Sequence, residues 1–378
     1  MPSLPDFRLE AHFSKWEFKA RHHLTASDME SVEVGQLLGW ADADDREVWS
    51  SLRLGYTETY GSPALRAAIA ATYDTLAVED VLGFAGAGEA IYCAMQVLLG
   101  PDDHAVVTVP NYQSFEELPL QICAVSGVAL RPEDDWELNL DAVRAALRPN
   151  TRVIAVNFPN NPTGKVIAPE TWRGLVALAE AHGAYLLSDE VYRGLERDPA
   201  RRLTQAADLS PRAVSINVMS KAYGLPGLRI GWIASRDRTL LGRFERFKHY
   251  TTICNAGPSE VLATIALKHR ERLLSRNRAL VVDNLAVLEA FFERHRHLFE
   301  WHAPEGGCVA YPRYLGADGV EVFCRDLVEQ AGVLLLPASI YASRLAPTPN
   351  DRFRIGYGRL GVPAGMAALE AFVDARGS

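Results

Sequence analysis

The sequence predicts an α/β protein with a mostly parallel central sheet in a large domain, joined to a smaller α+β domain. In the middle of the chain, short runs rich in Val and Ile alternate with segments of helical spacing, a pattern typical of parallel strands covered by helices on both faces. The four clearest runs are residues 104–110, 152–159, 184–190 and 213–219. We expect ligands to bind where these strands end, because the connecting loops gather at that edge of the sheet.

The rest of the chain follows an α+β pattern. A long helical stretch is expected from about Ser259 to His295, and mixed helices and strands follow it as far as FRIGYG (353–358). The first 45 residues have little strand character and are grouped with this second part. The predicted division is a large domain at residues 46–270 and a small domain formed by residues 1–45 and 271–378.

Composition and charge exclude several classes of protein. The net charge of −8 argues against coating nucleic acid or binding a membrane surface, since both require clustered positive charge. Five widely spaced cysteines without a CxxC pair indicate neither a disulfide framework nor a zinc site. No signal-peptide pattern and no apolar run of about 18 residues is present, so we expect a soluble, cytoplasmic protein with reduced thiols.

The first candidate site is the glycine-rich turn FAGAGEAI (84–91), which precedes a helical run. Backbone N–H groups at the start of a helix can bind a phosphate. As a dinucleotide fingerprint the turn is incomplete, because Ile91 stands where a third small residue is needed, and a nicotinamide dehydrogenase would rest on this defective pattern alone. A plain tight turn is the alternative.

Two more candidates end predicted strands. NFPNNPTGKV (157–166) is a strong turn sequence in which Asn161 could donate a hydrogen bond into a site, or which could be a purely structural loop with Lys165 at the surface. In LLSDEVY (186–192), the Asp189 carboxylate requires a cation or a protonated ring nitrogen as partner if it is buried, and Tyr192 is close enough to share that space. Helix capping by Ser188 or Asp189 is the alternative.

The fourth candidate is Lys221, in a chain where lysine is scarce. It follows a predicted buried strand, and small residues surround it in SKAYGLPGLRIGW (220–232). A desolvated lysine loses its proton more easily and becomes a nucleophilic amine, whereas the alternative is an exposed loop lysine. Together with a phosphate turn, an Asn, an Asp beside a Tyr, and Arg229, Lys221 completes the set of groups needed to hold pyridoxal phosphate (PLP).

The ordered motifs resemble the aspartate aminotransferase superfamily, the PLP-dependent transferases of fold type I and aminotransferase class I/II. The similarity spans nearly the whole chain and rests on GYTETYGSPALR, GAGEAI, VPNYQSF, NFPNNPTG, SDEVY, SKAYGLPGLRIGW and FRIGYG in the family order. SKAYGLPGLRIGW and NFPNNPTG, with an N-terminus of the form FSKWEF…SVEVGQLL, are also similar to the branch that contains capreomycidine synthase.

The resemblance implies a role for each matching residue. It implies that Lys221 forms the Schiff base with the cofactor and shuttles the proton, and that Asp189 pairs with the pyridine nitrogen. Tyr192 and Asn161 would donate hydrogen bonds to the phenolic oxygen, and Tyr112 would stack on the ring. The phosphate would be contacted by the backbone of Ala87 and Gly88, by Arg229, and by Tyr56 of a partner subunit in a homodimer. Arg354, with Asn161, would bind the substrate carboxylate, since an arginine can hold a carboxylate through two parallel bonds.

The chain departs from the family pattern at the phosphate site. Val218 stands where many relatives have a hydroxyl, and Ala87 and Gly88 stand where others carry Ser or Thr. Two phosphate contacts are therefore expected to be missing or replaced.

The activity implied is transfer of an amino group between an L-amino acid and a 2-oxo acid, with no metal. A different PLP reaction, elimination with cyclisation or oxidation of a modified amino acid, stays open because a fold does not fix a reaction. A PLP-binding regulatory protein would need a DNA-binding module, for which the N-terminus is too short. Trp16, Gly35 and residues 249–255 are candidates for the pocket of the substrate side chain.

Overall fold

A computed structural model describes residues 4–377 and contains a seven-stranded sheet of order β2-β8-β7-β6-β5-β3-β4. All neighbouring pairs are parallel except those made by β8, which is antiparallel to β2 and β7. The strands are β2 (Val81–Phe84), β3 (His104–Val109), β4 (Ala124–Ala129), β5 (Thr151–Asn157), β6 (Tyr185–Asp189), β7 (Ala213–Val218) and β8 (Gly231–Ala234). The predicted α/β class and the four predicted strands are confirmed, and β2, β4 and β8 complete the sheet.

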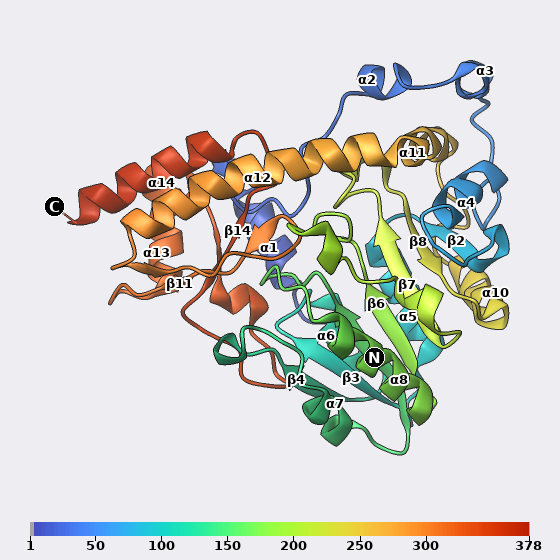
Figure 1. The fold of residues 1–378 in the computed structure, drawn as a ribbon, viewed down its shortest axis with the longest axis horizontal. Coiled ribbons are helices and arrows are strands. Elements are labelled where there is room, and N and C mark those ends of the chain that lie inside the picture. Colours follow the sequence, from blue (N-terminus) through green and yellow to red (C-terminus); the bar gives the residue numbers. More distant parts are fainter. Residues whose placement is uncertain (1–3, 378) are drawn as a thin grey trace.

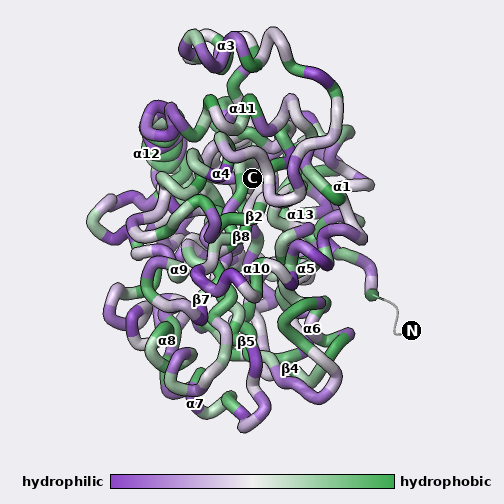
Figure 2. The backbone as a smooth tube through the Cα atoms, turned by 90° about the vertical axis from the view of Figure 1, so that its right-hand side faces the viewer, coloured by the Kyte–Doolittle hydropathy of each residue, from purple (hydrophilic) through white to green (hydrophobic). Residues whose placement is uncertain are grey.

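Helices cover both faces of this sheet (Figure 1). Alternate residues of β5 show the two sides, because Val153 and Ala155 belong to the core under α5 and α10, whereas Ile154 and Val156 belong to the core under α8. The helices are α4 (Pro63–Ala70), α5 (Ala87–Leu98), α6 (Ser114–Leu120), α7 (Leu140–Ala146), α8 (Pro169–His182), α9 (Ala206–Leu209), α10 (Arg238–Lys248) and α11 (Gly257–Lys268). Figure 2 shows hydrophobic residues around β2 and β8, near the middle of the view.

The remaining elements form small sheets with helices packed on them. The strands are β1 (His22–His23), which pairs with β12 (Val333–Leu334), β9 (Phe299–Glu300), which pairs with β11 (Arg313–Tyr314), and a sheet of β10 (Val309–Ala310), β14 (Phe353–Gly356) and β13 (Leu336–Pro337). The helices are α1 (Arg8–Trp16), α2 (Val34–Leu38), α3 (Ala43–Ser50), α12 (Arg270–Arg294), α13 (Val320–Asp326) and α14 (Val362–Gly377). In Figure 1, α12 and α14 run side by side along one edge of the molecule. The division at residues 45/46 and 270/271 stays a prediction.

The long helix expected from Ser259 to His295 is wrong in one respect, because the structure divides it into α11 and α12. The break falls at His269, whose backbone angles (φ −105°, ψ 24°) lie outside the helical range. Figure 1 shows the consequence, since α11 and α12 run in different directions.

All five cysteines are free in this structure. Within residues 4–377, no helix is long and apolar enough to cross a membrane.

Candidate active site

A cavity of about 260 Å³ lies where the parallel strands end, at the edge of the sheet at which a ligand is expected. Eight of the residues that the sequence motifs single out line it: Ala87, Gly88, Tyr112, Asn161, Asp189, Tyr192, Lys221 and Arg229. The other lining residues are Leu9, Glu10, Phe13, Ser27, Ile91, Asn157, Val191 and Ser220. The fold therefore brings most of the predicted site residues to one place.

Asp189 is the last residue of β6, and its pairing with β5 places it opposite Asn157. The amide of Asn157 donates to the Asp189 carbonyl (3.1 Å) and its oxygen accepts from the N–H of Asn161 (2.8 Å), so two neighbouring loops are joined. The Asp189 carboxylate accepts a bond from the N–H of Val191 (3.1 Å), and burial raises its pKa to about 7. A carboxylate that accepts from an N–H two residues later is also typical of helix capping, the alternative for this motif, but no helix begins at Asp189.

Lys221 follows β7, and its Nζ donates to the hydroxyl of Ser27 at 2.8 Å. Burial lowers the pKa of Lys221, and the charge of Asp28, acting in the opposite direction, does not restore it. Within residues 4–377, no carboxylate lies within the 4.0 Å of an ion pair with Nζ. Lys221 lines the cavity, so it is not the exposed loop lysine that was the alternative prediction.

The glycine-rich turn and Arg229 form one wall of the cavity. Gly86 has φ +97°, and α5 begins directly after it, so Ala87 and Gly88 occupy the first turn of a twelve-residue helix. The positive φ favours glycine at this position, and a Cβ there would lie 2.6 Å from Nη2 of Arg229, so the guanidinium would have to shift. The wall combines a helix N-terminus with a cation, which suits a phosphate.

Arg354 and Tyr56 lie outside the lining. Arg354 is fully buried behind Asn161, and its guanidinium donates to Asn161 Oδ1 (3.1 Å) and to the Thr25 carbonyl (2.6 Å). Its Nε is buried without a hydrogen-bond partner. Tyr56 is 92% exposed in the single chain and does not line the cavity.

These residues fit PLP on the chemistry of their donors. The cavity offers an amine for the aldehyde, a buried carboxylate with no cation bonded to it for the pyridine nitrogen, and a helix N-terminus with Arg229 for the phosphate. Ser220, directly before Lys221, supplies a hydroxyl to the lining where Val218 and the turn lack one. The sequence motifs contained this serine, but it received no role.

Four other lining residues come from the N-terminal segment. Leu9, Glu10 and Phe13 lie on α1 and Ser27 lies after β1. Of these only Phe13 falls in a motif, FSKWEF, and that motif implied no site role for it. Trp16, Gly35 and residues 249–255 are not among the described residues that line the cavity, whereas α1 contributes three lining residues.

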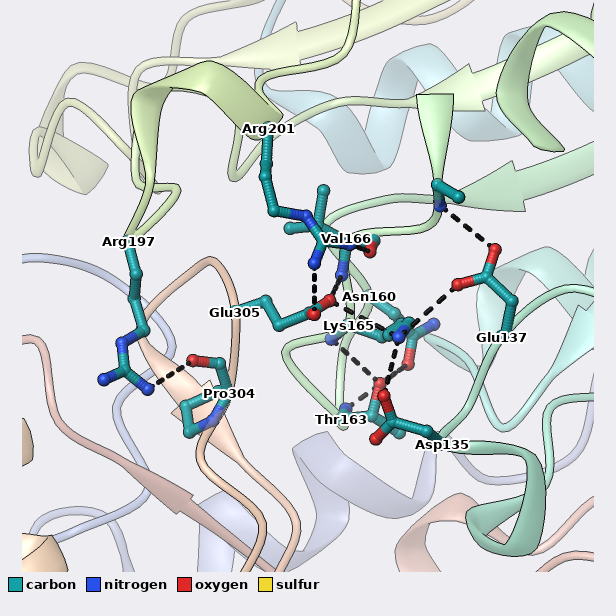
Figure 3. Close-up of polar contacts among 11 residues, drawn as sticks. Asp135, Glu137, Asn160, Thr163, Lys165, Val166, Arg197, Arg201, Pro304 and Glu305 are labelled. Atoms are coloured by element: carbon teal, nitrogen blue, oxygen red, sulfur yellow. Dashed lines mark hydrogen bonds and ion pairs between the residues drawn. The ribbon is translucent and has the colours of Figure 1, made fainter. Parts of the chain in front are cut away.

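Lys165 is not at the surface, contrary to expectation. Its side chain is 7% exposed and lies among the carboxylates of Asp135 (2.9 Å), Glu137 (3.4 Å) and Glu305 (3.5 Å), as Figure 3 shows. Glu305 also pairs with Arg201 (2.8 Å). The cluster fastens the loop that carries Asn161 to the segment before β10, so the sequence NNPTGK has a tertiary as well as a local function.

Comparison with known proteins identifies the family. A model of the family described as aminotransferase class I and II matches residues 30–366. The chain belongs to this family. Capreomycidine synthase from Streptomyces vinaceus is 32% identical over an alignment that covers 99% of this chain and 96% of its own length. An aspartate aminotransferase from Rhizobium meliloti is 28% identical over 80% of this chain and 77% of its own.

Solved structures agree with the sequence relatives. A PLP-dependent aminotransferase from Streptococcus suis 89-1591 superposes with a TM-score of 0.91 at 27% identity, covering 99% of this chain and 98% of its own. The PLP-dependent cyclase OrfR gives a TM-score of 0.89 at 27% identity, covering 100% and 99% of the two chains. The protein is therefore a PLP-dependent transferase of fold type I, as the sequence motifs implied.

Proposed function

We propose that this protein is an aminotransferase that moves an amino group from an L-amino acid to a 2-oxo acid, with the two substrates reacting in turn. The observation that carries the proposal is the meeting of Lys221 and Asp189 in one cavity, an amine with a lowered pKa and a buried carboxylate with no bonded cation. When bound, PLP supplies an aldehyde that takes up the amino group and a protonated ring that stabilises negative charge at the substrate α-carbon.

The residues of this chain divide the work. Lys221 Nζ takes the α-proton and returns it, and its lowered pKa favours this role because a lower pKa favours the neutral amine that accepts a proton. Asp189 holds a proton on the ring nitrogen, and the cation so formed would lower the pKa of the carboxylate from about 7. Arg354 binds the substrate carboxylate, using a guanidinium whose Nε has no partner.

Reduction with borohydride tests the assignment of Lys221 directly. In the wild-type holoenzyme, reduction should leave PLP covalently attached to the peptide that contains Lys221, as read by mass spectrometry. Lys221→Ala should lose the attachment, and Lys165→Arg should retain it because Lys165 lies outside the cavity. Attachment to any other residue of the wild-type protein would contradict the assignment.

A second reaction, elimination with cyclisation of a modified amino acid, is favoured by one specific observation. Capreomycidine synthase and the cyclase OrfR match essentially the whole chain, each at a level comparable to that of the aminotransferases. Mixing the holoenzyme with an amino acid separates the two reactions. Stoichiometric conversion of PLP to pyridoxamine phosphate supports transamination, and release of a cyclic or unsaturated product without that conversion supports the second reaction.

We also propose a homodimer in which the two subunits share their active sites. Tyr56, Leu54 and Tyr250 are 92%, 88% and 89% exposed in the single chain, and large exposed apolar side chains mark interaction surfaces. Mixed dimers of Lys221→Ala and Tyr56→Phe chains provide the test. One site of such a dimer would regain both native residues, so activity should exceed that of either parent, whereas sites complete within one chain would show no recovery.

A further inference from the structure

Residues 24–30, here called the Ser27 strap, lie between the loop of Lys221 and the end of β14, and Ser27 lines the cavity. The strap is held by backbone bonds at both ends, from Gly356 to the Leu24 carbonyl (2.8 Å) and from Glu30 to the Gly358 carbonyl (2.8 Å). The contact is close enough to require glycine, since a Cβ at Gly356 would lie 1.9 Å from the Ala26 carbonyl oxygen. The position of Ser27 is therefore fixed by the fold.

Three side chains of the site donate hydrogen bonds to this strap. Arg354 donates to the Thr25 carbonyl (2.6 Å) and the Tyr192 hydroxyl donates to the Ser27 carbonyl (3.1 Å). Lys221 Nζ donates to the Ser27 hydroxyl (2.8 Å), and Ser27 itself lines the cavity. The bond that the resemblance gives to Tyr192, toward the phenolic oxygen of PLP, stays a prediction. The strap brings the proposed proton carrier and the proposed carboxylate-binding arginine onto one rigid element.

The charged and titratable groups that face Lys221 are Asp28, Asp189, Cys308 and Arg354. Asp28, the neighbour of Ser27, is bound by Arg359 through both oxygens at 2.9 and 2.8 Å. Among the described residues, the side chain that directly meets Lys221 Nζ is thus a neutral hydroxyl.

A hydroxyl can serve both protonation states of an amine. It accepts a bond from the ammonium and can donate one to the lone pair of the neutral amine, whereas a carboxylate accepts only and stabilises the ammonium. A lysine that must take a proton and then return it requires a partner that favours the ammonium only modestly, as a neutral hydroxyl does and a carboxylate does not. A carboxylate at the same place would raise the pKa of the lysine and retain the proton.

We propose that Ser27 is the positioning residue of Lys221, which holds the free amine at the cavity wall whenever the amine is not bonded to the cofactor. The inference rests on the proposed role of Lys221 and goes beyond it, since it assigns a function to a residue outside every motif. Ser27 acts through the lysine amine, and it fixes the direction from which Nζ faces a substrate.

The first test uses the cofactor-free protein, so that it does not depend on the reaction. Labelling of Lys221 by an amine-specific reagent over a range of pH, followed by mass spectrometry of its peptide, gives the pKa of the lysine. Ser27→Ala should lower this pKa by about one unit, a tenfold change in proton affinity, because the ammonium loses its acceptor. Ser27→Thr, which keeps the hydroxyl, should restore the pKa, and Ser31→Ala, directly after the strap, should not change it.

The second test uses the holoenzyme and separates positioning from folding. Ser27→Ala should lower kcat about tenfold, a small part of the usual contribution of a proton carrier, with the KM for the amino acid nearly unchanged and the pH profile displaced toward acid. A Lys221 pKa that is the same in Ser27→Ala and wild type would overturn the proposal. So would a Ser27→Thr protein that is folded, as judged by its thermal unfolding, yet has the Lys221 pKa of Ser27→Ala. Failure of borohydride attachment at Lys221 would overturn the proposed function itself, which keeps the two failures apart.

Discussion

Asp189→Asn is expected to make the cofactor-free protein more stable at pH 8 and unable to bind PLP tightly. Burial raises the pKa of Asp189 from 3.8 to about 7, so the folded protein binds this proton more tightly than the unfolded chain. Such a group costs the folded state nothing below pH 3.8. The cost grows as the pH rises toward 7 and is complete above it.

The magnitude follows from the displacement of the pKa. A difference of about 3 units at 1.36 kcal/mol per unit amounts to about 4 kcal/mol at pH 8. Asparagine removes this cost but buries amide protons without partners, at about 1–2 kcal/mol, so the net gain is about 2–3 kcal/mol. At pH 5 the wild-type cost is only about 2 kcal/mol, and the gain should fall nearly to zero.

Urea unfolding of the cofactor-free proteins at pH 8 and pH 5, followed by tryptophan fluorescence, measures both quantities. Asp141→Asn is a matched control, because that carboxylate is 88% exposed and should show no pH-dependent gain. Added PLP should stabilise the wild type by mass action and Asp189→Asn far less. An Asp189→Asn protein that is no more stable than wild type at pH 8, or equally favoured at both pH values, would refute the reasoning.

Three other substitutions test other parts of the site. Arg354→Lys should raise the KM for amino acids at least tenfold in steady-state assays, because lysine cannot form two parallel bonds to a carboxylate. Gly86→Ala should weaken PLP binding, measured by fluorescence titration, because φ is +97° and the new Cβ would meet Arg229. Gly183 also has a positive φ but no neighbour within 4 Å of a new Cβ, so Gly183→Ala should leave the PLP affinity unchanged. Lys165→Met should lower the free energy of unfolding by about 2 kcal/mol. This loss is smaller than that expected from breaking a fully buried ion pair, because the carboxylates around Lys165 reach solvent. Burial alone would lower the pKa of Lys165, but the bond to Asp135 and the nearby carboxylates raise it, so this loss should be complete below pH 10.5 and should disappear as the pH rises past the raised pKa.

The sheet and the strand-end residues were predictable because each depends on a local pattern. Val- and Ile-rich runs identify buried parallel strands, and parallel strands necessarily bring their ends to one edge, which is why Asn161, Asp189 and Lys221 meet. β4 was less visible, since it is an edge strand with a partly exposed sequence, AVSGVA. The break at His269 was missed because helical spacing continues through it.

The environment of Lys165 could not be read in the same way. A lysine after Pro-Thr-Gly is typical of a surface turn, and what buries it comes from two other parts of the chain, Asp135 with Glu137 and Glu305. The Ser27 strap depends equally on distant partners, because the bond from Ser27 to Lys221 joins residues 194 positions apart. Contacts of this kind have no period and no motif, so only the folded chain reveals them.

We expect the choice between the two candidate reactions to depend on residues of α1. Both begin with removal of the substrate α-proton, so under the proposed roles both need Lys221, Asp189 and a bound carboxylate, and the residues at the sheet edge do not distinguish them. What separates an ordinary amino acid from one that cyclises is its side chain. On the proposed assignment, the cavity wall left for that side chain carries Leu9, Glu10 and Phe13, of which only Phe13 falls in a motif, FSKWEF. Substitutions on α1 are therefore the ones expected to change which amino acid reacts, and substitutions at the sheet edge are expected to abolish either reaction alike.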